Sequence, residues 1–362
     1  SRDSNSRSSS FKLNSDDIDH LLAGAEKAII ESNLTDSEDL NLVRQKVAEG
    51  AQTSITGITP IADKDNRTMS LIGVIGGSMI KSINGRTQYL NATSAKTNPS
   101  PLENALSGIT QVSISNMDEA GLPPSLVATA SKSVVGSLVG SLDEGGLSKN
   151  QIGGALKNIT SKAVDSLDQI EGISPSDITS SLKEITSGAT SALDQIEVSD
   201  YSASDLGEMV QEISSGATQA LGNIEIDGIS SDNLSSMMEK VTAGATGALG
   251  QISMEGYSSS SLTTMLSKIT SGATSALGDI EMEGYSSNNL SLMVEKITAG
   301  ATSALDEIQL EGFSSDNLSS MVQEITSGAT GALDEIEMAG FDPSTDVFSM
   351  TEKVVLGTTG AL

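Results

Sequence analysis

Residues 313–340 read FSSDNLSSMVQEITSGATGALDEIEMAG, and close copies of this unit fill the C-terminal two-thirds of the chain. The apolar residue that opens each unit recurs six times in succession at an interval of 28 residues, at positions 173, 201, 229, 257, 285, 313 and 341. A fixed period of this length indicates a tandem repeat protein. The fold therefore depends on the structure that one unit adopts.

Each unit begins with the signals of a helix N-terminus. Ser314 can cap a helix while Phe313 packs on Leu318 as a hydrophobic staple, and Ser148 with Gln151 predicts a capping box in an earlier unit. The apolar residues that follow have the i, i+3, i+4, i+7 spacing of an amphipathic helix. In the quoted unit they are Leu318, Met321, Val322, Ile325, Ala329, Ala332, Leu333 and Ile336.

A glycine stands in the middle of each apolar stripe. Inside a helix, glycine costs about 1 kcal/mol relative to alanine. Its recurrence at one position indicates either a close approach between helices or a break in the helix, and we favour close packing. The packing glycines are Gly188, Gly216, Gly244, Gly272, Gly300 and Gly328.

The segment after each stripe changes to a period of two, as in residues 280–285, which predicts extended backbone. A helix of about 22 residues is about 33 Å long, whereas six extended residues span about 20 Å. Successive helices must therefore run antiparallel or break at the glycine. If neighbouring units stack, Glu212 can pair with Lys240, and Lys296 with Glu324.

The predicted fold is mainly α. Tandem helical repeats of about 28 residues form an elongated solenoid or an antiparallel helix array, with short extended segments between helices. An α/β solenoid is the alternative. Residues 1–15 are expected to be a flexible polar tail, 16–120 to hold divergent repeats, and 121–362 to form the regular array. An Asn-Gly pair within residues 78–90 suggests a hairpin there.

The charge of the chain is strongly acidic and unevenly distributed. The formal net charge is −28, with 11 basic and 12 acidic residues in 1–100 but 4 basic and 24 acidic residues in 200–362. Such a surface repels nucleic acid and anionic lipid. The apolar stretch at 71–80 is too short to cross a membrane. With no cysteine, the chain has no disulfide or thiolate metal ligand.

The sequence shows no constellation of catalytic residues. His20 is the single histidine, and its helical context is that of an ordinary surface or core residue. The glycine-rich residues 73–77 lack the Gly-Lys-Ser/Thr of a phosphate loop and are better explained by packing. We therefore expect neither an enzyme nor an organic cofactor.

Carboxylates are the remaining candidates for ligand binding. Four of them occupy equivalent positions in successive units: Asp227, Glu255, Glu283 and Glu311. A stacked array would align them in a column that repels itself unless a cation such as Ca²⁺ intervenes. The alternative is a solvated acidic face.

Near-identical units without an active site suit a protein whose task is length and periodicity. The sequence favours a secreted or cell-surface structural protein, built as a rod or as a self-assembling filament or matrix subunit. We expect its partner to be a second copy, end to end, or another surface protein, and its location to be extracellular. The alternative is a helical-repeat scaffold or adhesin that binds another protein.

Overall fold

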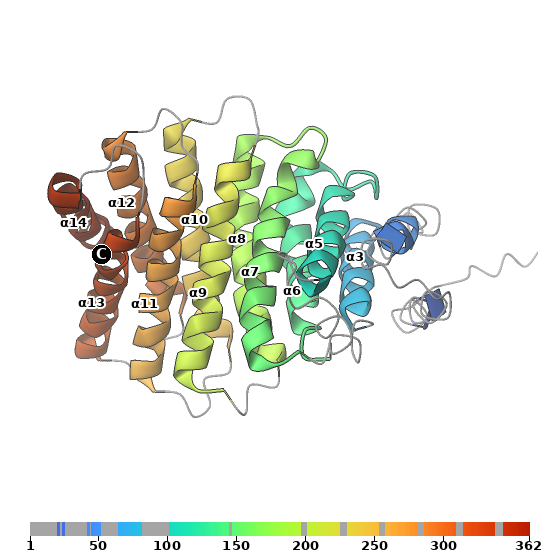
Figure 1. The fold of residues 1–362 in the computed structure, drawn as a ribbon, viewed down its shortest axis with the longest axis horizontal. Helices are drawn as coiled ribbons and strands as arrows, with labels where there is room; N and C mark the ends of the chain where they lie inside the picture. Colours follow the sequence, from blue (N-terminus) through green and yellow to red (C-terminus); the bar gives the residue numbers. More distant parts are fainter. Residues whose placement is uncertain are drawn as a thin grey trace, which may run out of the picture.

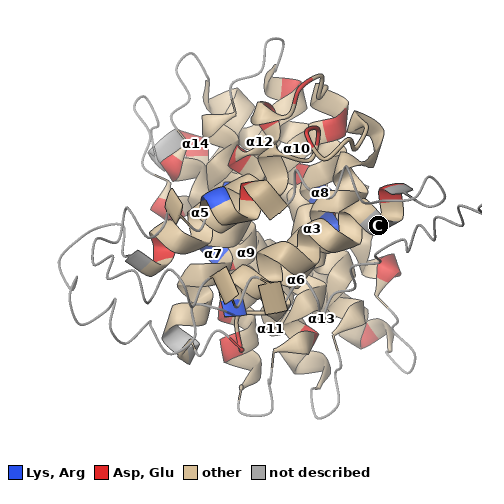
Figure 2. Cartoon of the chain, turned by 90° about the vertical axis from the view of Figure 1, so that its right-hand side faces the viewer, with Lys and Arg blue, Asp and Glu red and all other residues tan. Residues whose placement is uncertain are grey.

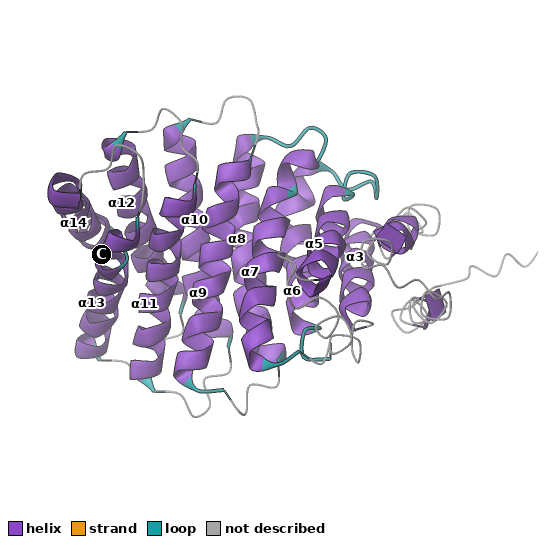
Figure 3. Ribbon diagram, in the orientation of Figure 1, coloured by secondary structure: helices purple, strands orange, loops and turns teal. Residues whose placement is uncertain are grey.

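The computed structural model describes residues 20–21, 24–25, 42–43, 45–51, 64–81, 101–144, 147–196, 201–224, 230–252, 258–280, 286–308, 314–336 and 343–362. In these residues the regular structure is helical, with no strand (Figure 3). The prediction of a mainly α repeat array, in preference to an α/β solenoid, is therefore confirmed.

The α-helices that the structure describes in full span 14 to 18 residues each. They are α3 Lys64–Lys81, α5 Pro101–Ser115, α6 Val127–Gly140, α7 Lys149–Asp165, α8 Pro175–Ser191, α9 Ala203–Ala220, α10 Ser231–Ala248, α11 Ser259–Ser275, α12 Ser287–Ser303, α13 Ser315–Gly331 and α14 Pro343–Gly360. The 3₁₀ helices are Pro124–Leu126, Leu167–Gln169, Ala192–Gln195, Leu221–Asn223, Leu249–Gln251, Ala276–Asp279, Ala304–Glu307 and Leu333–Glu335.

From α7 to α13 the helices begin at serine caps, as the sequence predicts. At α13 the Oγ of Ser314 accepts a hydrogen bond from the backbone N–H of Asn317, and the Asn317 side chain accepts one from the Ser314 N–H. Ser148 and Gln151 form the corresponding box at α7. Each box satisfies backbone donors that the first helical turn leaves without partners. Phe313, the expected staple, lies outside the described residues.

From α8 to α13, each helix ends in a short 3₁₀ turn followed by an isoleucine with extended backbone. Ile280 after α11 has φ −86° and ψ 117°, and Ile308 after α12 has φ −82° and ψ 126°. The 3₁₀ turn provides hydrogen bonds to the last carbonyl groups of the helix and directs the chain away from the helix axis. The predicted extended segments thus begin at these isoleucines, and the rest of them lies outside the described residues.

The helices form two layers. Each helix packs mainly on the helix two positions away in the chain and less on its immediate neighbour. Layer A comprises α5, α7, α9, α11 and α13, and layer B comprises α3, α6, α8, α10, α12 and α14. Both layers run along the array from α3 and α5 at one end to α13 and α14 at the other (Figure 1).

Helices in the same layer run parallel. Ser214 contacts Ile269, and Thr270 contacts Ile325, with an offset of 55 residues in both cases. A helix of 17 residues is about 26 Å long, which is longer than a six-residue connection can reach. The chain therefore reverses direction between consecutive helices, and the structural period is two sequence repeats.

This period corrects the expected pairing of neighbouring units. Lys296 forms its ion pair with Glu239, 57 residues away, and not with Glu324. The positive charge that acts to lower the pKa of Glu212 is that of Lys157, in the preceding helix of layer A, and not that of Lys240. Adjacent units lie in opposite layers, so their equivalent side chains do not stack.

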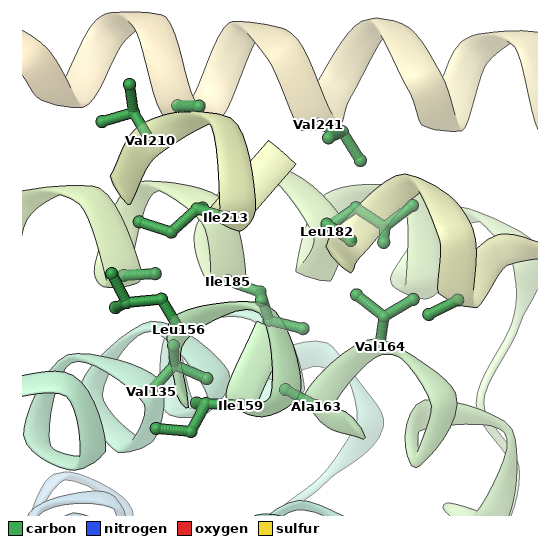
Figure 4. Packing of buried hydrophobic residues seen from close by; sticks show 14 of the residues in the cluster. Val135, Leu156, Ile159, Ala163, Val164, Leu182, Ile185, Val210, Ile213 and Val241 are labelled. Carbon is green, nitrogen blue, oxygen red and sulfur yellow. The ribbon is translucent and has the colours of Figure 1, made fainter. Parts of the chain in front are cut away.

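The core lies between and within the two layers. The β-branched residue at the centre of each stripe is fully buried, as at Ile185, Ile213 and Val241. Figure 4 shows Ile185 and Ile213 among valine, leucine and alanine side chains from successive helices. Aliphatic and small side chains fill this interior, in keeping with an aromatic content of 2%.

The predicted hairpin at residues 78–90 is wrong in its first strand. Residues 78–81 belong to α3, and 82–90 lie outside the described residues. The apolar spacing of α3 continues through Met79 and Ile80, both buried, and this tertiary burial outweighs the local turn signal. The polar tail, residues 1–15, also lies outside the description.

No helix in the described part of the chain is long and apolar enough to span a membrane.

We predict that Ser314→Ala lowers the stability of the chain by about 0.5–2 kcal/mol, because the first turn of α13 loses its cap. Ser319→Ala is the control, since Ser319 is an exposed residue within the same helix and alanine favours helix there. Thermal unfolding followed by circular dichroism measures both. Equal melting temperatures for the two variants would contradict the role of the cap.

Candidate functional site

The six packing glycines lie at one recurring contact, which we call the packing seam. A Cβ added to Gly272 would lie 2.5 Å from the carbonyl oxygen of Gln211 and 2.9 Å from the Oγ of Ser214. Gly300 faces the carbonyl of Glu239 and Thr242 in the same way. In both cases the two contacts come from the preceding helix of the layer. The carbonyl belongs to the residue five positions before the packing glycine of that helix, or its equivalent, and the hydroxyl to the residue two positions before it. The other packing glycines meet the matching carbonyl in the same manner: Gly188, Gly216, Gly244 and Gly328.

Close backbone approach, and not a helix break, therefore accounts for these glycines. The α-helical hydrogen bonding continues through Gly272 and Gly300, which lie inside α11 and α12. With no Cβ at the contact, the backbone of one helix lies against a carbonyl of the next, as small residues permit in close helix pairs. Gly73 and Gly77 of α3 lie against Ser137 and Ser141 of α6, so this glycine-rich run is also a packing surface.

Hydroxyl groups bridge the helices along the seam. The Oγ1 of Thr242 donates to the carbonyl of Ile297 at 2.9 Å, and the Oγ1 of Thr270 donates to that of Ile325 at 3.1 Å. Ser214 bonds Ile269 at 3.0 Å in the same way. A hydroxyl has one proton, so each of these groups shares it between the neighbouring helix and its own. The sequence analysis did not single out these residues.

A second row of hydroxyls is buried without a partner. Among the described residues, five threonines two positions after the packing glycine have no hydrogen bond to the side-chain oxygen. At the last helix of layer A, the equivalent Thr330 is less buried and donates to the carbonyl of Thr326 at 2.8 Å. The five are Thr190, Thr218, Thr246, Thr274 and Thr302.

Ion pairs connect helices within layer B. The Nζ of Lys296 lies 2.7 Å from the Oε2 of Glu239, and that of Lys353 lies 2.7 Å from the Oε2 of Glu295. Each lysine stands four residues before its own packing glycine. These side chains are about a quarter to a third exposed, so each pair stabilises the fold modestly but fixes the register of the stacked helices.

A hollow of about 230 Å³ lies between α7 and α9. Asp205, Glu208 and Glu212 line it from α9, beside Gly153 and Gly154 of α7. Burial raises the pKa of Glu212 above its usual value, Lys157 opposes this shift, and the nearby Glu208 adds to it. The hollow is therefore an acidic surface suited to a cationic group.

The proposed carboxylate column is not described by the structure. Asp227, Glu255, Glu283 and Glu311 all lie in connections outside the described residues. The part that is described holds no group of three or more histidine, aspartate or glutamate side chains placed to share a metal ion. Calcium binding by the column stays a prediction. His20 is an exposed helical residue.

Exposed apolar side chains gather at the two ends of the array. Of the described residues, seven large hydrophobic side chains are exposed, and all lie before residue 43 or after residue 317. Leu318 of α13 is 37% exposed, whereas the equivalent Leu290 of α12 is 2% exposed. The other six are Leu21, Leu42, Phe348, Val355, Leu356 and Leu362.

No protein-family model matches the chain, and no curated protein matches it.

We predict that Gly300→Ala destabilises the chain by about 1–2 kcal/mol. The added methyl group meets the Glu239 carbonyl, and overpacking of about 1–3 kcal/mol exceeds the helix-propensity gain of about 1 kcal/mol. Gly154→Ala is the matched control, because a Cβ there meets nothing within 4 Å and should raise stability. Melting temperatures that rise for both variants would show that the seam tolerates a Cβ.

Of two buried threonines in α10, one has a hydroxyl that is hydrogen-bonded to a neighbouring helix and the other has a hydroxyl without a hydrogen bond. We predict that Thr242→Val costs about 1 kcal/mol, because the bond to Ile297 is lost, whereas Thr246→Val is neutral or stabilising. Both residues are fully buried, so the burial term is the same. Chemical denaturation gives the two free energies of unfolding. An equal loss in both variants would contradict this assignment.

Proposed function

We propose that the chain is a structural repeat protein that supplies a rod or filament subunit by associating end to end with further copies. The observation that carries this proposal is the confinement of exposed large apolar side chains to the two ends of the described array. A solenoid that acts as a monomer needs terminal repeats with polar outer faces. On the outermost described helix, α14, the side chains of Phe348, Val355 and Leu356 are exposed instead.

The end formed by α13 and α14 illustrates the contrast. Phe348 is 77% exposed and aligns with Ser319, a polar residue, in the preceding unit. Val355 and Leu356 stand where that unit has Thr326 and Ser327. The outermost helix of layer B therefore exposes apolar side chains at positions that are polar one unit earlier. Contiguous apolar surface of this kind marks a protein interaction site.

The charge distribution favours contact between unlike ends. Residues 200–362 hold 4 basic and 24 acidic residues, whereas residues 1–100 are nearly balanced. Two C-terminal ends repel each other, but an N-terminal end approaches a C-terminal end with less repulsion. Figure 2 shows acidic residues far outnumbering basic ones over the described helices. A contact between unlike faces does not close, so it produces open filaments.

We place this function outside the cell, on composition alone. The chain has no cysteine, few basic residues and much serine and threonine, a style common in secreted and surface proteins. The second candidate is a scaffold or adhesin that binds another protein. It is supported by the acidic hollow beside Glu208 and Glu212, which suits a basic segment of a partner.

Sedimentation velocity and electron microscopy test the proposal. We expect linear oligomers that lengthen with protein concentration, and we expect Phe348→Ser/Leu356→Ser to shift the population to monomers. Ser180→Ala/Ser260→Ala, on exposed positions of α8 and α11, is the control and should assemble normally.

A chain that stays monomeric at all concentrations would refute the filament function. Monomers that gain mass only when a partner protein is added would favour the scaffold. Assembly of the double serine variant at wild-type strength would show that the α14 face is not involved.

A further inference from the structure

The stacking rule inside the array defines what a partner of its C-terminal face must present. From Gly216 to Gly328, each packing glycine sits on a carbonyl five residues, and a hydroxyl two residues, before the glycine or equivalent residue of the preceding helix in its layer. Gly328 of α13, for example, sits on Ser267 and Thr270 of α11. A helix that continued the layer would bring a glycine to the corresponding groups of the helix before it.

On α13 these receiving groups are Gln323 and Thr326. Gln323 is exposed and Thr326 is only half-buried, whereas the equivalent Thr270 of α11 is fully buried beneath α13. The Oγ1 of Thr326 lies 2.9 Å from the carbonyl oxygen of Val322 in its own helix and 3.5 Å from the Oγ1 of Thr358 in α14. The outer surface of α13 is therefore a half-seam, which we define by Leu318, Gln323 and Thr326.

The opposite end of the molecule presents the complementary half. Residues 45–51 are helical and read QKVAEGA, in register with residues 295–301, EKITAGA. The side chain of Gln45, five residues before Gly50, lies against Gly108 of α5, which indicates that this segment precedes α5 in layer A. A Cβ added at Gly50 would meet nothing within 4 Å. The space beside Gly50 is open, while the packing glycines of the array face a preceding helix.

A lysine accompanies this glycine at the register position. Lys46 stands four residues before Gly50, as Lys296 and Lys353 stand before Gly300 and Gly357. Those two lysines reach back to a glutamate on the preceding helix of layer B. Lys46 pairs with Glu49 of its own helix at 2.5 Å and is largely exposed. Its charge is opposite to that of Glu324, next to Gln323 on the C-terminal face.

We infer that copies of this chain join head to tail by extending layer A across the junction, with Gly50 of one copy seated on Gln323 and Thr326 of another. This inference rests on the proposed function, to which it adds the site and its register. Lys46 then comes to the position from which Lys296 reaches Glu239, and Leu318 is covered as Leu290 is in the interior. Gly24, where a Cβ also meets nothing within 4 Å, gives the N-terminal end a second open glycine for α14.

The first test fills the open space at Gly50. Gly50→Leu leaves the monomer intact, because nothing lies within 4 Å of the new Cβ, but it prevents a close approach of helices. We expect its end-to-end association to weaken by about tenfold or more in sedimentation velocity. Ser180→Leu is the matched control, an exposed helical position in the middle of the array, and should assemble as the wild type does.

The outcomes separate this inference from the proposed function. Equally strong association of the wild type and of Gly50→Leu would overturn the inferred register but leave end-to-end assembly intact. A monomeric wild type would overturn both. Equal loss in Gly50→Leu and Ser180→Leu would also overturn the inference, because the effect would not be specific to the junction. Circular dichroism confirms that each variant remains helical.

The second test identifies which faces meet. Because the chain has no cysteine, Lys46→Cys and Gln323→Cys place single thiols on the two faces. A short bis-maleimide linker should join the two variants when they are mixed. Joining within either variant alone, Lys46→Cys to itself or Gln323→Cys to itself, would show that like ends meet and would overturn the inference. Glu239→Cys/Lys296→Cys, which replaces the ion pair between α10 and α12 of one chain, is the positive control.

Discussion

Close contact between a glycine backbone and a carbonyl of the preceding helix in the layer is the constraint on which the array depends. At this distance a Cβ cannot be accommodated, so the glycine recurs wherever a helix stacks on another. The contact also brings the hydroxyls of Thr242 and Thr270 within reach of the next helix. One small residue thus sets the spacing, the hydrogen bonds and the register of the ion pairs in layer B.

The buried threonine hydroxyls without a hydrogen-bond partner are a second consequence of this close packing. In an isolated helix, a threonine hydroxyl bonds the carbonyl four residues earlier, as Thr330 does at the end of layer A. In the interior, Thr246 and Thr274 lack that bond. Close packing there determines the position of the side chain, and an unmade hydrogen bond opposes stacking by about 1–3 kcal/mol. The buried aliphatic residues around the central isoleucines outweigh this cost.

The sequence was sufficient for the type and number of elements in the regular region but not for their connectivity in space. Serine caps and the apolar stripe act locally, and they predicted each helix between α7 and α13. The layer arrangement requires a period of 56 residues, which is visible only in small differences between alternate units. Glu239-Lys240 and Glu295-Lys296 recur in layer B, whereas Gln211-Glu212 and Gln323-Glu324 recur in layer A. Treating all units as equal led to the wrong stacking partners. The hairpin failed for another reason, because burial of Met79 and Ile80 in α3 outweighed a local turn signal.

A periodic stack has no intrinsic end, because the surface that receives one helix is recreated on that helix for the next. Termination therefore requires a change of sequence, such as polar residues on the outer face. Layer A makes no such change at α13, where Thr326 and Gln323 retain the receiving pattern. Layer B changes at α14 in the opposite direction, toward Phe348, Val355 and Leu356. The outer faces of the last two described helices thus keep the receiving pattern or add apolar side chains, and a Cβ at Gly50 would meet nothing within 4 Å. Under the proposed function, the interaction that builds the array within one chain also joins two chains.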